Sequence, residues 1–479
     1  MLKQDLKIKQ IVDSLDIQKH NITKKVLNIV GGDAVLLFVK QLTDANMLSE
    51  NVIKPITNFS AAEESRISTD AMISKVLYTA DCKTDEDETK ILEYILSGMT
   101  VLLLPHEKKY VLINIKQVQH RSVATPEIQY VVRGPKDCFI ENLDVNLSLL
   151  RNRIKDPNLR IKSFTVGRRT KSQVAMVYIE DIANGDSVNE MEKRISSIDI
   201  DGIYESGELQ ELLQNKQTNF FPQMGIIERS DMASRLLLEG RIVTLVEGSG
   251  LAIYAPVAFV EFLYSCDDYY DNKYFTIFMR LVRYFSLMTA FAASSLYVAM
   301  TSFHPEVLPS QYTIILAEMS SNVPFPAFMG AIILEFLMEI IRESLFRVSK
   351  HIGSAVGIVA AIVIGQASID AGIFSPILLI IASVSLLTSF VVPDFTLMNS
   401  FRVLKFLLLI STGLFGFYGF MLFLCIVLTN LVSISSFGVP YIAPFAPFNI
   451  RDFLKTFMFS KAISSYRTNF VKPKDNKLK

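Results

Sequence analysis

The sequence lacks tryptophan and has few of the residues that bind metals, with four cysteines and five histidines in 479 residues. Cys82, Cys138, Cys266 and Cys425 lie far apart in the chain, and their spacing matches neither a disulfide framework nor a metal site. The histidines also show no ligand spacing. We therefore expect no metal site in this protein.

Recognisable catalytic and nucleotide-binding patterns are absent as well. The turn at Gly248–Gly250 has no GxGxxG pattern and no Walker lysine, so it is not a phosphate-binding loop. No combination of serine, histidine and aspartate can be derived from spacing. We predict that the chain is not an enzyme and that it binds no cofactor.

The chain has no excess of charge of either sign, because 48 Lys and Arg residues balance 48 Asp and Glu residues. This balance argues against a broad nucleic-acid surface, and no nucleic-acid partner is expected. Residues 1–30 contain no unbroken apolar core of the kind found in signal peptides. We therefore expect the N-terminal region to be cytoplasmic.

Long segments without charge are concentrated in the second half of the chain. The longest covers 45 residues, 406–450, and three others cover 284–302, 352–369 and 371–393. A helix needs about 20 apolar residues to cross a bilayer. Residues 1–240, in contrast, are charged throughout. The predicted fold class is α+β, with a soluble N-terminal α/β region of two small subdomains followed by a polytopic α-helical membrane domain.

The composition predicts five segments along the chain. They are a flexible Lys-rich lead-in (1–32), a first cytoplasmic α/β subdomain (33–150), a second cytoplasmic α/β subdomain with a membrane-proximal segment (151–280), a transmembrane domain (281–450) and a basic cytoplasmic tail (451–479).

Two parts of the α/β region resemble each other. A helical segment that ends at Gly98 precedes two short apolar strands, and a similar segment that ends at Gly240 also precedes two strands. One structural module used twice would explain the similarity, and so would chance in so short a window.

The distribution of Lys and Arg predicts how the membrane domain is oriented, since these residues favour the cytoplasmic side. Loops 303–322 and 370–372 contain neither, whereas 342–351, 394–405 and the tail are basic. Spans are expected at 284–302, 323–341, 352–369 and 373–392. The segment after residue 406 has room for two further passes, or for one pass and a re-entrant or interfacial segment. The total is therefore five or six spans.

Two carboxylates lie inside the second predicted span. Glu335 and Glu339 are one helical turn apart, and Glu335 is seven residues from Arg342, which marks the cytoplasmic end. A charge at this depth, roughly 10 Å from the end, is unfavourable in lipid and should face protein or water. Glu335 and Glu339 are therefore candidates for an ion path, and the alternative is a buried polar contact within the helix bundle.

A stripe of small residues marks the third predicted span. Gly353, Gly357, Ala361 and Gly365 repeat every four residues and would let another helix approach closely, and Gln366 at the outer end could hydrogen-bond across the contact. The stripe could serve packing within the chain, a contact between subunits or the lining of a pore.

Several short motifs, in this order and spacing, resemble the A subunit of bacterial spore germination receptors, the GerA family. The matching segments are Val132-Arg133-Gly134-Pro135, Leu150-Arg151-Asn152-Arg153, Phe220-Phe221-Pro222-Gln223, Leu238-Glu239-Gly240-Arg241, Asp267-Asp268-Tyr269-Tyr270, Phe303-His304-Pro305-Glu306, Val323-Pro324-Phe325-Pro326, Ile364-Gly365-Gln366-Ala367 and Ser436-Phe437-Gly438-Val439-Pro440-Tyr441. The resemblance covers about residues 33–450.

The resemblance implies a multi-pass protein of the spore inner membrane, in contact with membrane lipid. It would act with a transporter-like B subunit and a lipoprotein C subunit, and it would sense nutrients and trigger ion release. It also implies a homo-oligomer that forms a channel-like component. The family supplies no catalytic residue. A secondary transporter and a non-conducting membrane scaffold remain as alternatives.

Overall fold

The computed structural model describes residues 3–17, 20–29, 32–59, 68–79, 81–105, 107–115, 129, 134–214, 219–321, 323–347, 357–359, 361–457 and 466–477. The chain forms two compact units. The α/β unit comprises residues 1–214, 224–256 and 465–479, and the helical unit comprises residues 215–223 and 257–464.

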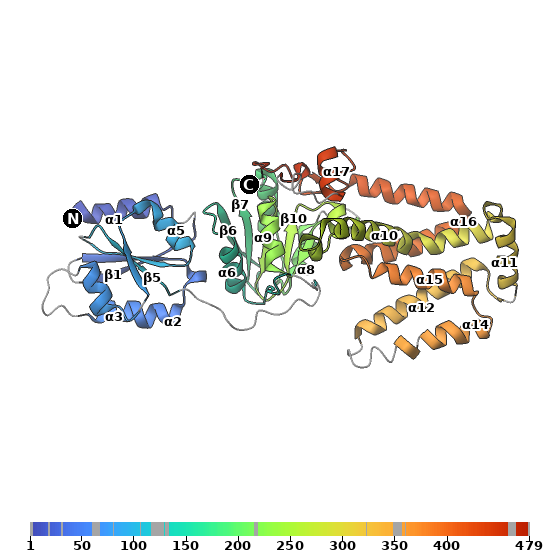
Figure 1. Ribbon diagram of the computed structural model, residues 1–479, viewed down its shortest axis with the longest axis horizontal. Coiled ribbons are helices and arrows are strands. Elements are labelled where there is room, and N and C mark those ends of the chain that lie inside the picture. Colours follow the sequence, from blue (N-terminus) through green and yellow to red (C-terminus); the bar gives the residue numbers. More distant parts are fainter. Residues whose placement is uncertain are drawn as a thin grey trace. The chain divides into compact units, whose positions relative to one another are not determined.

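The first half of the α/β unit is built on a five-stranded antiparallel sheet with the order β1-β2-β4-β5-β3 (Figure 1). Its strands are β1 (Thr23–Ile29), β2 (Gly32–Phe38), β3 (Cys82–Asp85), β4 (Thr100–Leu103) and β5 (Tyr110–Ile113). Its helices and helical turns are α1 (Lys3–Ser14), η1 (Lys40–Leu42), α2 (Ala45–Leu48), η2 (Ser49–Ile53), α3 (Lys54–Asn58), α4 (Thr69–Ala71), η3 (Met72–Val76), η4 (Glu88–Lys90) and α5 (Ile91–Leu96).

Helices cover both faces of this sheet, which explains the continuous apolar runs in its central strands, such as 34–38 in β2 and 101–103 in β4. Neighbouring residues of a strand point to opposite faces. Val35 therefore packs in one core with α1 and α5, whereas Leu36 packs in another with α2 and α3. The result is a three-layer arrangement of helix, sheet and helix.

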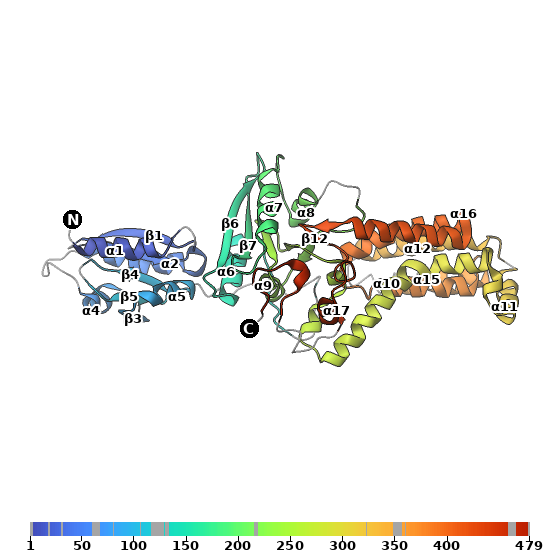
Figure 2. The same cartoon turned by 90° about the horizontal axis from the view of Figure 1, so that it is seen from above.

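The second half of the α/β unit repeats this topology, with the strand order β6-β7-β9-β10-β8. Figure 2 labels β6 and β7 of this sheet, together with α6, α7 and α9. Its strands are β6 (Leu159–Val166), β7 (Ser172–Ile179), β8 (Gly225–Ile227), β9 (Ile242–Val246) and β10 (Ala252–Ala255). Its helices are α6 (Leu143–Arg153), α7 (Gly185–Ser196), α8 (Ser206–Leu213) and α9 (Ser230–Leu238), and the turn η9 (Asn469–Val471) belongs to the same unit. α6 packs against α9, and α7 against α8.

The predicted repeat is confirmed by this topology. In both sheets a helix (α5 or α9) ends just before a glycine and leads into a hairpin (β4–β5 or β9–β10). Gly98 and Gly240 have φ values of 94° and 91°, a left-handed conformation that glycine adopts without strain at the end of a helix. One module is therefore used twice.

The predicted boundaries within the α/β region differ from the structure in two respects. Residues 1–32, expected to be a flexible lead-in, contain α1 and the edge strand β1, because apolar residues such as Val12 and Leu27 supply buried side chains between the lysines. The division expected near residue 150 stays a prediction, because α6 packs with α9 and β9 of the second half and also with η1 of the first. Residues 466–477, part of the predicted tail, also belong to the α/β unit.

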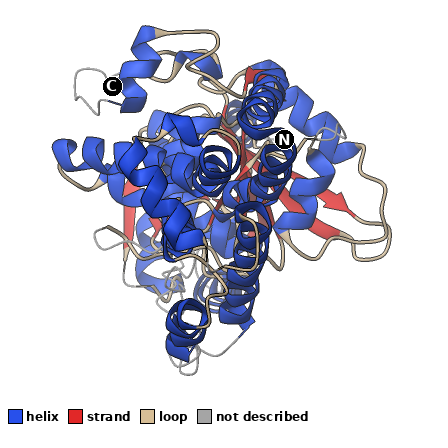
Figure 3. Cartoon of the chain, turned by 90° about the vertical axis from the view of Figure 1, so that its right-hand side faces the viewer, coloured by secondary structure: helices blue, strands red, loops and turns tan. Residues whose placement is uncertain are grey.

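The second unit is helical, and its only described strands are the two-residue β11 (Ser435–Ser436) and β12 (Val439–Pro440) (Figure 3). Its long helices are α10 (Lys273–Ser302), α12 (Ala327–Arg347), α15 (Pro376–Ser389) and α16 (Phe395–Ser433). Its shorter helices and turns are η5 (Phe259–Leu263), η6 (Cys266–Tyr269), η7 (Pro305–Val307), α11 (Ser310–Ser320), η8 (Ala361–Ala367), α14 (Ser368–Asp370) and α17 (Ile450–Phe457).

α16 consists of two helical limbs that fold back on each other at Gly416. This glycine has φ 62° and ψ −143°, which interrupts the helix. Ser411 Oγ donates a hydrogen bond of 3.0 Å to the carbonyl oxygen of Gly419, although eight residues of a straight helix span about 12 Å. The chain therefore reverses direction inside the long uncharged segment. This agrees with the expected return after residue 406, and its relation to a membrane stays a prediction.

Two of the described helices, α10 and α16, are long and apolar enough to cross a membrane by length and composition. Five or six spans were expected. α12 carries Glu335, Glu339, Arg342 and further charges within its 21 residues, and α15 has only 14 residues. The expected third span lies partly outside the described residues.

Candidate functional site

Glu335 lies in the middle of α12 and is enclosed by three other long helices of the helical unit. Its side chain is 1% exposed. The surrounding core includes Val298 of α10, Leu334 of α12, Leu378 of α15 and Leu409 of α16. A carboxylate in such surroundings needs a compensating charge and hydrogen bonds.

Two side chains satisfy this carboxylate. Lys405 of α16 donates from Nζ to Glu335 Oε2 at 2.5 Å, and its own side chain is only 7% exposed. Ser294 of α10 donates a hydrogen bond to the other carboxylate oxygen, Oε1. Glu335 therefore connects α12 to both α10 and α16.

A second ion pair lies one turn further along α12. Arg402 Nε donates to Glu339 Oε2 at 2.9 Å, and Arg342 Nη1 donates to Glu339 Oε1 at 3.3 Å. Glu335 pairs with Lys405 and Glu339 with Arg402, so α12 and the first limb of α16 run antiparallel here. The Glu339 side chain is 15% exposed, which makes this pair less enclosed than the first.

Arg342 extends the same network to α15. Its Nη2 donates to Ser389 Oγ at 2.5 Å, and its guanidinium lies 5.2 Å from the ring centre of Phe390. We call Glu335, Glu339, Arg342, Arg402 and Lys405 the charge ladder. With Ser294 and Ser389, it joins α10, α12, α15 and α16, the long helices among the described residues.

The charge ladder carries three positive and two negative charges. Breaking a buried ion pair by removing one partner typically destabilises a protein by about 3–5 kcal/mol, because the other charge is left uncompensated. Replacement of either Glu335 or Lys405 alone by an uncharged residue should therefore destabilise the helical unit. An ammonium group already occupies the position where a mobile cation would contact Glu335.

A separate buried cluster lies at the beginning of α10. Asp268 accepts hydrogen bonds from Arg280 Nε at 3.1 Å and from Arg283 Nη1 at 2.8 Å. The Arg280 guanidinium also lies 4.1 Å from the ring centre of Tyr264 and donates to the backbone oxygen of Thr456. This cluster fixes the end of α17 and the turn η6 to the start of α10.

The α/β unit contains a polar contact at its surface between Asp137, Arg153 and Ser230. Arg153 Nη2 donates to both oxygens of Asp137, and Ser230 Oγ donates to the same carboxylate. Burial raises the pKa of Asp137, but the hydrogen bonds from Arg153 and Ser230 outweigh burial, so the pKa lies below its ordinary value. The adjacent Cys138 is buried, and this burial raises the pKa of its thiol to about 12.

The stripe of small residues is only partly described. Gly353 lies outside the described residues, and the side chain of Ala361 is also not described. A Cβ atom added at Gly357 or at Gly365 would meet no atom within 4 Å, and Gln366 is exposed. These two glycines therefore make no close helix contact with the described part of this chain.

Glu335 and Glu339 thus belong to the same charge ladder. The structure describes no contact between this ladder and Gly357 or Gly365. The sequence does not identify Lys405 and Ser294 as site residues, and the basic segment 394–405, which contains Arg402 and Lys405, predicts only the orientation of the membrane domain. Arg402 and Lys405 are three residues apart, and Glu335 and Glu339 are four residues apart, so each pair lies on one face of its helix. This spacing is the signal that could have suggested a pairing between the two helices.

Comparison with known proteins places the chain in a family. A family model described as Bacillus/Clostridium GerA spore germination protein matches residues 6–469. Spore germination protein B1 of Bacillus subtilis (strain 168) is 36% identical over 86% of this chain and 85% of its own length. Spore germination protein GerLA of Bacillus cereus is 30% identical over 98% of this chain and 96% of its own.

Among solved structures, the N-terminal domain of the A subunit of the Bacillus megaterium spore germinant receptor GerK3 matches with 25% identity and a TM-score of 0.36. The match covers 52% of this chain and 94% of that chain. The family model and the two relatives span most of the sequence. The chain therefore belongs to the GerA family of spore germination proteins, and its role is in spore germination.

Proposed function

We propose that the chain is the A subunit of a nutrient germinant receptor in the spore inner membrane. In this proposal it is a multi-pass protein with a cytoplasmic N-terminal region, and it acts with a transporter-like B subunit and a lipoprotein C subunit. Membership of the GerA family and the apolar helices α10 and α16 support the proposal.

We further propose that several copies assemble and that Glu335 and Glu339 line a cation path. Rings of carboxylates favour cations in channels. The observation that carries this proposal is the enclosed Glu335, which lies among four long helices and has an ammonium group, that of Lys405, as its partner. A monovalent cation has to replace Lys405 at the Glu335 carboxylate, so the described arrangement corresponds to a non-conducting state.

Gly357 and Gly365 suit a contact between copies better than a contact within one chain. An added Cβ atom at either position would meet only open space, and close approach of backbones is the usual reason for small residues on membrane helices. We assign Gly353, Gly357, Ala361, Gly365 and Gln366 to such a contact between subunits.

The role in a germinant receptor is tested by deleting the gene for this chain and adding single nutrients to the resulting spores. We expect the loss of cation release and of germination with at least one nutrient, and restoration by the intact chain. Unchanged responses to every nutrient that the parent spores recognise would contradict the proposal.

A non-conducting scaffold is the second candidate, because Glu335 is paired on both oxygens. Current across a planar bilayer containing the purified protein separates the two functions. A cation-selective current supports the channel. The absence of current across a bilayer that contains correctly assembled protein supports the scaffold. Uptake of nutrient into vesicles would instead indicate a secondary transporter.

A further inference from the structure

A cavity of about 410 Å³ lies in the helical unit, apart from the charge ladder. It lies between the end of α10, α11, the segment before α12 and the start of α15, and it is partly open, since Ala317, Ser320 and Phe325 of its lining are exposed. Cavities that bind small molecules typically have volumes of about 300–1,000 Å³. This cavity is therefore large enough to hold a small molecule.

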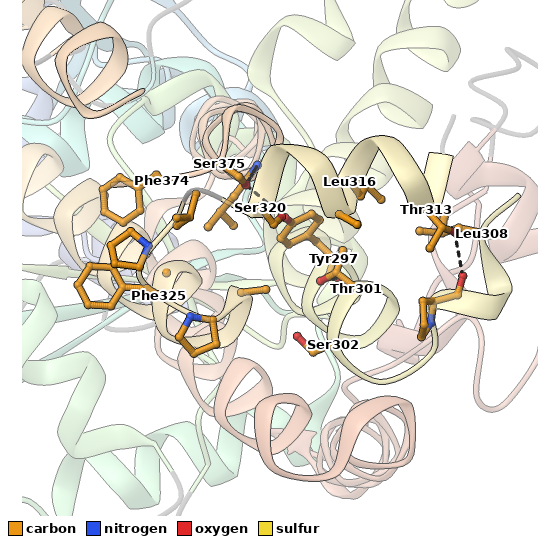
Figure 4. A pocket seen from close by; sticks show the side chains of 18 residues that line it. Tyr297, Thr301, Ser302, Leu308, Thr313, Leu316, Ser320, Phe325, Phe374 and Ser375 are labelled. Atoms are coloured by element: carbon orange, nitrogen blue, oxygen red, sulfur yellow. Dashed lines mark hydrogen bonds between the residues drawn. The ribbon is translucent and has the colours of Figure 1, made fainter. Parts of the chain in front are cut away.

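The lining combines aromatic rings with hydroxyl groups, and none of its eighteen described residues carries a charge. Phe325 and Phe374 lie toward one end, Thr313 lies toward the other, and Tyr297 lies between them (Figure 4). The Tyr297 hydroxyl is 3.3 Å from Ser375 Oγ, so two hydroxyl groups meet in the wall.

The absence of charge on the described lining determines which ligands fit. A carboxylate or an ammonium group bound next to the buried Tyr297 and Ser375 would lose part of its hydration without gaining an opposite charge. A hydroxyl or carbonyl group, in contrast, can exchange hydrogen bonds with Tyr297 and Ser375, and an apolar ring can pack against Phe325 and Phe374.

We propose that this cavity is a binding site for a small uncharged molecule that has an apolar body and a hydroxyl or carbonyl group. The inference does not depend on the channel function, because it concerns only the cavity of a single chain. Two helices, α10 and α12, connect the cavity with the charge ladder. Tyr297 follows Ser294 by three residues on α10, and Gly330 of the lining precedes Glu335 by five residues on α12.

The test uses the purified full chain in lipid nanodiscs and ¹⁹F NMR of 4-fluorobenzyl alcohol, which has one ring and one hydroxyl group. The anion 4-fluorobenzoate and the cation 4-fluorobenzylammonium serve as probes of matched size. We expect saturable binding of the alcohol and at least tenfold weaker binding of both ions. Empty nanodiscs measure simple partition into lipid.

Two variants of α11 provide a matched pair. Ala317→Trp adds a large side chain at the lining of the cavity, whereas Ile314→Trp adds the same side chain at a position of the same helix that does not line the cavity. We expect Ala317→Trp to abolish saturable binding and Ile314→Trp to retain it. Tyr297→Phe removes only one hydroxyl group and should weaken binding of the alcohol severalfold.

Three results would overturn the proposal. The first is binding of the alcohol that is equal in both tryptophan variants. The second is binding of 4-fluorobenzoate as strong as that of the alcohol. The third is a signal no larger than that of empty nanodiscs. If Ala317→Trp does not accumulate, Tyr297→Phe decides the question, since unchanged affinity in that variant would exclude the hydroxyl group of Tyr297 from the site.

Discussion

Lys405 and Glu335 form an ion pair of 2.5 Å between α16 and α12, next to the pair of Arg402 and Glu339 that joins the same helices. Ser294 completes the pairing from a third helix. The pair therefore has two consequences that can be separated by mutation. It stabilises the bundle, and it determines whether the carboxylate is accessible to another cation.

The stabilising consequence is tested by Lys405→Met. This change leaves the Glu335 carboxylate buried without a counter-charge, and we expect a loss of about 3–5 kcal/mol in the free energy of unfolding. The measurement is the amount of folded protein in spore membranes and its resistance to thermal unfolding in detergent.

The double variant Glu335→Gln, Lys405→Met is the control for this prediction, because it removes both charges together. It should recover most of the protein level while cation release stays impaired. Equal destabilisation in the single and double variants would show that the introduced methionine side chain disturbs packing and that the ion pair has no separate role.

The fold-back of α16 depends on Gly416. An added Cβ atom would come within 2.8 Å of the Phe303 ring, and the positive φ of 62° already disfavours other residues. Gly416→Ala should therefore destabilise the helical unit by about 1–3 kcal/mol. Gly365→Ala is the control, because an alanine there would meet open space in a helical conformation. Equal thermal stability of the two variants would contradict this explanation of the reversal.

The α/β unit should lose stability in acid through Asp137. Its pKa in the folded protein lies below the unfolded value of about 3.9, so its contribution is complete above that value and is lost as the pH falls through the folded pKa. Asp137→Asn should remove about 1–2 kcal/mol at neutral pH and less in acid. Thermal unfolding of both proteins from neutral pH to about pH 3 checks this, and parallel curves would exclude the carboxylate as the cause.

The predicted orientation can be tested with single cysteines. Gln311 lies on α11, in the loop expected outside, and Arg347 lies at the basic end of α12, expected inside. A cysteine at position 311 should react with an impermeant maleimide added from outside, and one at position 347 should react only after permeabilisation. The native cysteines are replaced first, because Cys425 is exposed and would react as well. The opposite labelling pattern at positions 311 and 347 would contradict the predicted orientation.

Much of the architecture could be predicted from the sequence, because it follows from local pattern. The change from charged to uncharged segments separates the two units, and the glycines after α5 and α9 mark the repeated module. Edge strand β1 was missed because Lys24 and Lys25 dominate its composition, and its apolar partners lie in β2.

Of the buried ion pair, only Glu335 could be predicted from the sequence, because its partner lies far away in the chain. Glu335 is conspicuous as a single charge in an apolar stretch of helix. Its partner Lys405 lies 70 residues away, at the edge of a charged segment where a lysine normally faces water. The antiparallel packing of α12 against the first limb of α16 brings them together, and the apolar core around Leu334 and Leu409 supports that packing.

The cation path through Glu335 is tested most directly by Glu335→Gln in spores. The glutamine amide oxygen can still accept a hydrogen bond from Lys405, but the buried Lys405 loses its counter-charge, so the protein level should fall and cation release is compared at equal protein level. Cation release after nutrient addition, measured with the protein level in parallel, should be slower than in the parent, and Glu335→Lys should be slower still because it reverses the charge. Release at the parent rate from spores with an equal level of the Gln variant would contradict the cation path and leave Glu335 as a packing contact.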